Sequence, residues 1–207
     1  STGFFVDSGQ SLGGNTSSSV ALGDLDGDGD LDAFAAADIW LNDGTGSFVG
    51  HAGPLANETW DVALGDLDGD GDLDGATVAY ESKTLAWFEN DGTPAHGEWK
   101  KYLIEQDVPE TRTMRAADFD GDGDMDLLGT VRRARAVVWY ENRGHANTVS
   151  WEKHYIDDKS LCPAHGNPAD MDGDGDLDVV MALGFYFRPD SDDPDASHKR
   201  EDNQVVW

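Results

Sequence analysis

Four stretches of the chain share one nine-residue pattern that is dense in carboxylates. Residues 24–32, 66–74, 118–126 and 170–178 each have aspartate at positions 1, 3, 5, 7 and 9, and glycine at positions 4 and 6. Carboxylates only a few ångströms apart repel one another unless a cation lies between them. The pattern therefore predicts four sites for a hard divalent cation.

The spacing of the aspartates is that of a calcium loop. In such a loop, side-chain oxygens at positions 1, 3 and 5 and the backbone carbonyl at position 7 surround the ion, and glycine at position 6 allows the sharp turn. We expect the aspartate at position 9 to complete the shell. The sequence thus predicts about four Ca²⁺ ions, one per loop. The predicted metal residues are Asp24, Asp26, Asp28, Asp30, Asp32, Asp66, Asp68, Asp70, Asp72, Asp74, Asp118, Asp120, Asp122, Asp124, Asp126, Asp170, Asp172, Asp174, Asp176 and Asp178.

The residues after each loop exclude an EF-hand. That motif needs a bidentate glutamate at position 12 and a following helix. Position 12 is Ala35, Thr77, Gly129 or Met181 in the four loops. Short apolar runs that are typical of β-strands follow instead. We therefore expect each metal loop to join two strands of a hairpin.

The loops start at residues 24, 66, 118 and 170, and other features repeat with them. A strand with tryptophan follows each loop, and in the first three units an outer strand comes next, at 46–49, 99–104 and 151–156. Repeats of about 40–50 residues with several strands each are typical of propeller blades. The prediction is an all-β fold, a β-propeller built of four-stranded antiparallel blades, with about four blades in this chain.

The predicted first strand, at residues 2–6, resembles residues 45–49 of the outer strand of the first unit. The fourth unit lacks an outer strand of its own, so this N-terminal strand is expected to complete the last blade and to protect an open sheet edge. Three arrangements fit: a four-bladed ring, an eight-bladed ring of two chains, or a portion of a larger propeller. Residues 1–207 are therefore expected to form a single propeller domain or a portion of a larger one.

The composition of the chain limits the kinds of molecule that it could bind and indicates where it acts. The net charge is −28, and 20 of the 42 acidic residues lie in the four loops, so nucleic acid is an unsuitable partner. The chain has no membrane-spanning apolar run and no signal peptide, so we expect a mature, processed or excised form. Calcium loops of extracellular modules bind at about 0.1–1 mM, which predicts a secreted protein. The single cysteine, Cys162, excludes an internal disulfide.

The motif D-h-D-G-D-G-x-x-D and the strand 139–142 (WYEN) resemble the FG-GAP and VCBS repeats of integrin α-subunit propellers and of many secreted proteins. The resemblance covers nearly the whole chain and implies a calcium-loaded β-propeller with the aspartates as ligands. The family includes adhesion receptors, lectins and polysaccharide lyases, so the fold alone does not define the activity.

The metal loops are expected on one rim of the propeller, which leaves the opposite face for recognition. Five arginines lie in or beside the loops of that face, where they suit carboxylate or sulfate groups. They could also pair with neighbouring acids across the blade, and the aromatic residues of 185–187 could pack between blades. The candidate ligand-binding residues are Trp60, Arg112, Arg115, Arg132, Arg133, Arg135, His165, Tyr186 and Arg188.

Three functions follow from these features. The first is a secreted module for recognition of a glycan or an extracellular protein, with structural Ca²⁺ and no catalytic group. The second is a lyase-like enzyme acting on polysaccharides, in which the arginines neutralise a uronate carboxylate and His165 or a tyrosine moves the proton. The third is a structural fragment that assembles with other copies into a larger ring.

Overall fold

In the computed structural model, the described residues form β-strands and no helix. They comprise residues 7–12, 18–35, 38–53, 59–79, 82–96, 99–108, 110–144, 148–160 and 163–183, together with the backbone of 204–206. In this part of the chain there is no helix long and apolar enough to cross a membrane. The all-β prediction is confirmed.

The strands form four antiparallel sheets that follow the chain order. Three sheets have four strands each, and the fourth has three described strands. The strands of the four sheets in turn are β1 (Val20–Gly23), β2 (Asp32–Ala35), β3 (Asp38–Asn42) and β4 (Phe48–Ala52); β5 (Thr59–Gly65), β6 (Asp74–Ala79), β7 (Thr84–Glu89) and β8 (Lys100–Glu105); β9 (Thr111–Ala117), β10 (Asp126–Val131), β11 (Ala136–Asn142) and β12 (Trp151–Asp157); and β13 (Gly166–Ala169), β14 (Asp178–Leu183) and β15 (Gln204–Val206).

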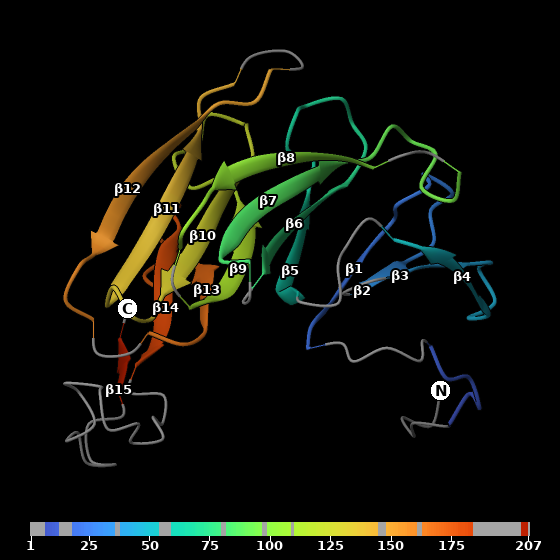
Figure 1. Cartoon of the computed structure of the whole chain (residues 1–207), viewed down its shortest axis with the longest axis horizontal. Coiled ribbons are helices and arrows are strands. Elements are labelled where there is room, and N and C mark those ends of the chain that lie inside the picture. Colours follow the sequence, from blue (N-terminus) through green and yellow to red (C-terminus); the bar gives the residue numbers. More distant parts are fainter. Residues whose placement is uncertain are drawn as a thin grey trace.

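The sheets are arranged like the blades of a propeller. The first strands lie next to one another, because β1 contacts β5, β5 contacts β9 and β9 contacts β13. Figure 1 shows the sheets side by side in an open arc, with β1–β4 at one end and β13–β15 at the other. The strand predicted at residues 2–6 lies outside the described residues.

Apolar side chains fill the space between neighbouring sheets. In β10, every residue is buried, because sheets lie on both sides of this strand. The largest cluster joins the second and third sheets and contains Leu67, Trp87, Met114 and Tyr140. Packing between sheets, rather than within one sheet, thus forms the core.

The exposed fraction of the second residue of each metal loop shows whether another sheet packs against that loop. Leu25 and Leu67 are each 1% exposed, since each lies in a cluster shared with the following sheet. The equivalent Met171 of the fourth sheet is 49% exposed. Val20 of β1 is 60% exposed, whereas the equivalent residues of the next two sheets, Val62 and Met114, are buried. Uncovered apolar side chains thus lie at both ends of the arc.

Candidate metal centres and ligand pocket

The metal loops connect the first and second strands of each sheet, as predicted. Antiparallel pairing carries the chain directly from β1 to β2 across residues 24–31, and the other three loops lie at the same point of their sheets. Each loop is therefore held at both ends by strand hydrogen bonds. This placement fixes the carboxylates on a rigid framework.

Carboxylate oxygens of each loop lie close enough to share one ion. In every loop, single oxygens of three aspartates all lie within 4.8 Å of one another. Two oxygens that bind one Ca²⁺ at about 2.4 Å are at most about 4.8 Å apart, so these separations suit Ca²⁺. The groups are Asp24, Asp26 and Asp32; Asp66, Asp68 and Asp70; Asp118, Asp120 and Asp122; and Asp170, Asp172 and Asp178.

Backbone hydrogen bonds hold the loop in its curved shape. In the first loop, Gly29 has a φ of 94°, and its N–H donates to Oδ2 of Asp24 at 3.0 Å. The N–H of Asp30 donates to Oδ1 of Asp28 at 2.9 Å. The positive φ is one that residues with a side chain rarely adopt, which explains the glycine at position 6. The loop is thus curved around the space that its carboxylates enclose.

The aspartate at position 9 has a structural role as well. Asp32 is fully buried, and its two oxygens accept hydrogen bonds from the N–H groups of Leu25 and Asn42, both at 2.8 Å. Asp74 and Asp126 make the same two contacts in their sheets. Each carboxylate therefore joins its loop to the third strand. A carboxylate oxygen has a second lone pair, so these contacts still permit metal binding.

The side chain at position 7 lies against the turn between the third and fourth strands in the first two sheets. A Cβ atom added at Gly44 would lie 2.4 Å from Oδ2 of Asp30. At Gly92, it would lie 2.7 Å from Oδ2 of Asp72.

One unsatisfied atom shows that the first loop suits a cation. Oδ1 of Asp24 is buried and accepts no hydrogen bond. A buried carboxylate oxygen without a partner costs free energy that a bound cation would recover. The residues present therefore fit a hard divalent ion.

The pKa values of several loop aspartates are also those of crowded acids. Removal from water, followed by repulsion from neighbouring carboxylates, raises the pKa of Asp26, Asp68 and Asp120, the residues at position 3. Burial raises the pKa of Asp74 to about 7 and that of Asp126 above its ordinary value. These groups are thus hard to ionise unless a positive charge lies beside them.

Three asparagines that we did not predict as site residues bind the metal loops, and two of them connect the loops of neighbouring sheets. Nδ2 of Asn90 donates to the carbonyl of Leu25 in the preceding sheet at 2.9 Å and to that of Leu73 in its own loop at 3.2 Å. Asn142 makes the same pair of contacts, while Asn42 reaches its own loop. Their recurrence after the tryptophan strands of the first three units was the available signal.

The comparison with family models matches residues 118–181 to the FG-GAP-like repeat. This segment is thus similar to an FG-GAP-like repeat. The matched segment contains the third metal loop, strands β10 to β13, the fourth loop and the first part of β14. No curated protein matches the chain. The FG-GAP-like repeat and the arrangement of the sheets together indicate an integrin-like β-propeller module.

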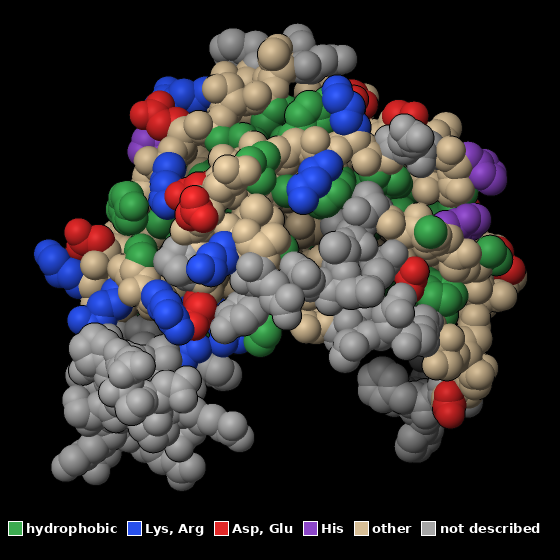
Figure 2. Space-filling model, in the orientation of Figure 1, with side chains coloured by type: hydrophobic (Ala, Val, Ile, Leu, Met, Phe, Trp, Pro, Cys, Tyr) green, Lys and Arg blue, Asp and Glu red, His purple; other side chains and the backbone are tan. Residues whose placement is uncertain are grey.

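Several arginines of the predicted ligand face are engaged in ion pairs. The carboxylate of Glu110 binds Arg132 at 3.1 Å and Arg133 at 2.8 Å. Nη1 of Arg115 lies 2.8 Å from Oδ2 of Asp61 on the neighbouring sheet. These three side chains thus follow the alternative in which arginines pair with acids. On the face shown in Figure 2, the basic side chains are spread over the surface, several of them beside acidic ones.

The remaining predicted ligand residues are only partly brought together. The guanidinium of Arg112 lies 4.0 Å from the ring centroid of Trp60. Arg135 lies in the turn between β10 and β11, and Nδ1 of His165 is 3.4 Å from Oγ1 of Thr113. Tyr186, Arg188 and Cys162 lie outside the described residues. The role of the whole set in ligand binding stays a prediction.

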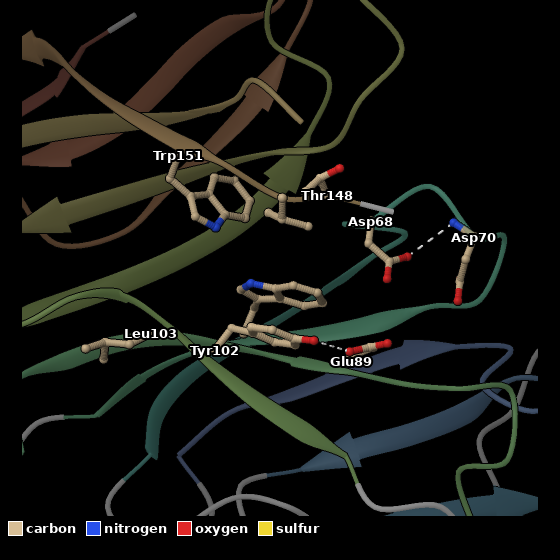
Figure 3. A pocket seen from close by; sticks show the side chains of 9 residues that line it. Asp68, Asp70, Glu89, Tyr102, Leu103, Thr148 and Trp151 are labelled. Atoms are coloured by element: carbon tan, nitrogen blue, oxygen red, sulfur yellow. Dashed lines mark hydrogen bonds between the residues drawn. The ribbon is translucent and has the colours of Figure 1, made fainter. Parts of the chain in front are cut away.

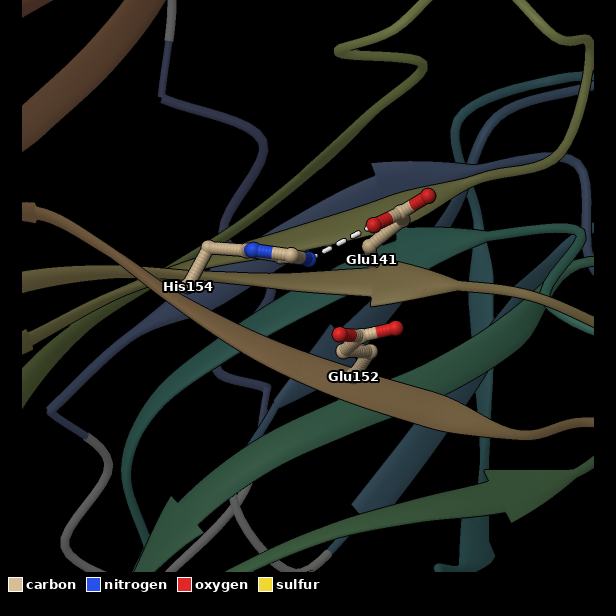
Figure 4. A group of neighbouring side chains, drawn as sticks. All are labelled: Glu141, Glu152 and His154. Carbon is tan, nitrogen blue, oxygen red and sulfur yellow. Dashed lines mark hydrogen bonds and ion pairs between the residues drawn. The ribbon is translucent and has the colours of Figure 1, made fainter.

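The FG-GAP-like repeat also carries a cluster of charged residues on β11 and β12, shown in Figure 4. Oε2 of Glu141 lies 2.6 Å from Nε2 of His154 and 2.9 Å from Nη2 of Arg143. Nε of Arg143 is 2.6 Å from Oε2 of Glu152. Because Arg143 already supplies a positive charge to both glutamates, this cluster is an ion-pair network.

A pocket of about 300 Å³ opens beside the second metal loop (Figure 3). It lies between the second sheet and the strand β12 of the third, and it was not predicted from the sequence. Asp68 and Asp70 form part of its wall, so it belongs to the side of the molecule that carries the metal loops. Its lining residues are Asp68, Asp70, Trp87, Glu89, Tyr102, Leu103, Thr148, Val149 and Trp151.

Proposed function

We propose that the chain is a secreted, calcium-binding β-propeller module that recognises a glycan or an extracellular protein, with Ca²⁺ as a structural ion. The observation that carries this proposal is the recurrence of one carboxylate arrangement in four loops. The buried, unpartnered Oδ1 of Asp24 supports it further. A bound Ca²⁺ would offset part of the repulsion among the five carboxylates of its loop.

The residues of each loop would have different roles in binding the ion. Aspartates at positions 1, 3 and 5 and the backbone carbonyl at position 7 would hold the ion, and the aspartate at position 9 would close the shell. The same position-9 residue ties the loop to the third strand, as Asp32 does through the N–H of Asn42. Loss of the ion would therefore weaken the sheets and not the loops alone.

Thermal unfolding in Ca²⁺ and in EDTA tests the structural role. An ion present at 100 times its dissociation constant stabilises the folded state by about 2.7 kcal/mol per site, so EDTA should lower the melting temperature clearly. Asp26→Asn should reduce the calcium content by one ion, because it removes one charged ligand of the first loop. Asp158→Asn, a surface control, should retain all the ions. An unchanged melting curve in EDTA would contradict the proposal.

Self-assembly is a second candidate, and a specific observation favours it. Leu25 and Val62 belong to one cluster between the first and second sheets, and Leu67 and Met114 to one between the second and third. In both pairs, the second residue of one metal loop packs against the first strand of the next sheet. Met171 is the equivalent loop residue of the fourth sheet, and Val20 is the equivalent residue of the first strand; both are exposed. If copies join there, light scattering should give a multiple of the 22.3 kDa chain mass, and Met171→Glu should give the single-chain mass. A single-chain mass for the unmodified protein would contradict assembly.

The lyase hypothesis has less support. Arg115, Arg132 and Arg133 already bind acids of the chain, so a substrate carboxylate would have to displace those partners. Incubation with acidic polysaccharides should therefore give no unsaturated product that absorbs in the ultraviolet. Formation of such a product would favour the enzyme.

A further inference from the structure

The pocket beside the second metal loop has aromatic walls. Trp87 of β7 and Tyr102 of β8 are paired across the two strands, and their rings stack at a centroid distance of 4.5 Å and an angle of 10°. Trp151, at the start of β12, lies on the other side of the pocket from Tyr102 (Figure 3). An occupant would therefore lie between aromatic groups of two neighbouring sheets.

This combination is specific to the second sheet. The equivalent cross-strand pair is Trp40 and Gly50 in the first sheet, where a Cβ atom on Gly50 would collide with the indole at 2.6 Å. In the third sheet, the pair is Trp139 and His154, tilted by 32°. The described sheets thus hold a parallel aromatic stack at this position only around Tyr102.

Polar groups also line the pocket. Oε2 of Glu89 accepts a hydrogen bond from the hydroxyl of Tyr102 at 2.5 Å, and Asp68 and Asp70 contribute further acceptor oxygens. Nε1 of Trp151 is buried and donates to no acceptor among the described residues. The equivalent Trp99 donates to the carbonyl of Pro94 at 3.4 Å. The pocket therefore combines flat apolar surfaces with acceptor oxygens for several hydroxyl groups.

The charges of the pocket favour a neutral occupant. Glu89 has a counter-ion in Lys100, whose Nζ lies 3.9 Å from Oε2. Under the proposed function, Ca²⁺ binds Asp68 and Asp70 and offsets part of their negative charge. A cation would then gain little, and an anion would face carboxylates that offer it no donors.

We propose that this pocket binds one ring of a neutral glycan, with the sugar against the aromatic walls and its hydroxyl groups on the carboxylates. A volume of about 300 Å³ is at the lower end for small-molecule sites, which suits a single ring. Aromatic side chains supply large apolar contact area together with polar atoms at their edges. This inference rests on the proposed function, since Asp68 and Asp70 are predicted ligands of the second ion and also form the pocket wall.

Nuclear magnetic resonance of the indole N–H groups tests this inference. The chain has seven tryptophans, and Trp151→Phe identifies the signal of Trp151. We expect methyl glycosides of neutral hexoses or N-acetylhexosamines to shift this signal in Ca²⁺, whereas a methyl glycoside of a hexuronic acid and tetramethylammonium should not. Trp151→Ala should weaken sugar binding by at least about tenfold, since buried aromatic anchors dominate such sites. Tyr155→Ala, which removes an exposed aromatic ring from the same strand, should leave it unchanged.

Chelation gives the second arm of the test. EDTA should weaken binding of a neutral sugar by at least about tenfold, because uncompensated carboxylates would disturb the wall; for a cationic ligand, the same treatment would strengthen binding. Absence of any response to neutral glycosides, a response to tetramethylammonium, or unchanged affinity in Trp151→Ala would overturn the inference. Metal content measured on the same sample distinguishes failure of the pocket proposal from failure of the proposed function. Bound ions without sugar binding would refute the pocket proposal alone. Absence of bound ions would refute the proposed function.

Discussion

At the scale of single residues, buried polar side chains connect the metal loops to the rest of the molecule. Asn90 is almost completely buried, and its amide spans the loops of two sheets through the carbonyls of Leu25 and Leu73. Asp74 binds the backbone N–H of the same asparagine at 2.8 Å. A change at either residue should therefore affect both the loop and the contact between sheets.

Asn90→Ala should lower the free energy of unfolding by about 1–3 kcal/mol, because it removes the donor to the buried carbonyl of Leu25 and to the partly buried carbonyl of Leu73. Asn42→Ala is the matched control. Asn42 is less buried and reaches only the carbonyl of Leu31, so its loss should cost less. Urea unfolding of both variants measures the difference. Equal decreases in the free energy of unfolding would show that the hydrogen bond between the two sheets does not contribute to stability.

The raised pKa of Asp74, about 7, predicts a pH dependence that calcium reverses. Without Ca²⁺ the folded state binds more protons at this group than the unfolded state, whose value is 3.8. The contribution of Asp74 to stability is then present at acid pH and lost as the pH rises through about 7. Ca²⁺ favours the ionised carboxylate, so the rise in melting temperature caused by Ca²⁺ should grow from about pH 5 to about pH 8. A calcium effect that shrinks over this range would contradict the role of Asp74.

The metal aspartates could be predicted from the sequence because their spacing is local, and nine consecutive residues contain most of one site. The partners of the arginines could not be predicted, since Glu110 and Asp61 belong to other strands or turns. The pocket was missed for the same reason. Trp87 and Trp151 are far apart in the chain and meet only because β12 lies beside the second sheet.

At the scale of strands and sheets, close contacts between side chain and backbone set the spacing of the blades. Gly75 of β6 lies against Phe34 of β2, and a Cβ atom there would be 2.3 Å from Cζ of the ring. Phe34 is fully buried, so it has no free space to enter. The small residue thus permits the first sheet to pack on the second.

Gly75→Ala should destabilise the protein by about 1–3 kcal/mol, as expected for an overpacked core. Gly129→Ala in β10 is the control, because its closest contact would be Cγ2 of Val138 at 3.3 Å. Thermal unfolding of both variants provides the comparison. Phe34→Leu combined with Gly75→Ala should recover part of the loss, and a Gly75→Ala variant as stable as the original would argue against close packing here.

Strand order could be predicted from the repeat because each sheet is built from consecutive hairpins. Every strand predicted within the described residues is present, from Val20–Gly23 to Gln204–Val206. The extent of the ring could not be predicted in the same way. It depends on surfaces such as those of Met171 and Val20, whose partners are not set by local sequence.

At the scale of the whole molecule, the negative charge of the metal loops affects the stability of the folded state. The chain carries a net charge of −28, and almost half of its acidic residues lie in four loops on one side of the propeller-like arc. Such a concentration destabilises a compact state through self-repulsion unless cations neutralise it. Calcium binding is therefore the property on which stability and the wall of the pocket both depend.

Native mass spectrometry of the calcium-loaded protein measures this property most directly, because it counts bound ions on each folded copy. We predict four Ca²⁺ ions per chain, and three for Asp26→Asn. Magnesium should compete poorly, since Mg²⁺ requires a tighter octahedral shell. A folded protein that carries no bound Ca²⁺ at a saturating calcium concentration, or an Asp26→Asn variant that retains all four ions, would contradict the assignment of the loops as calcium sites.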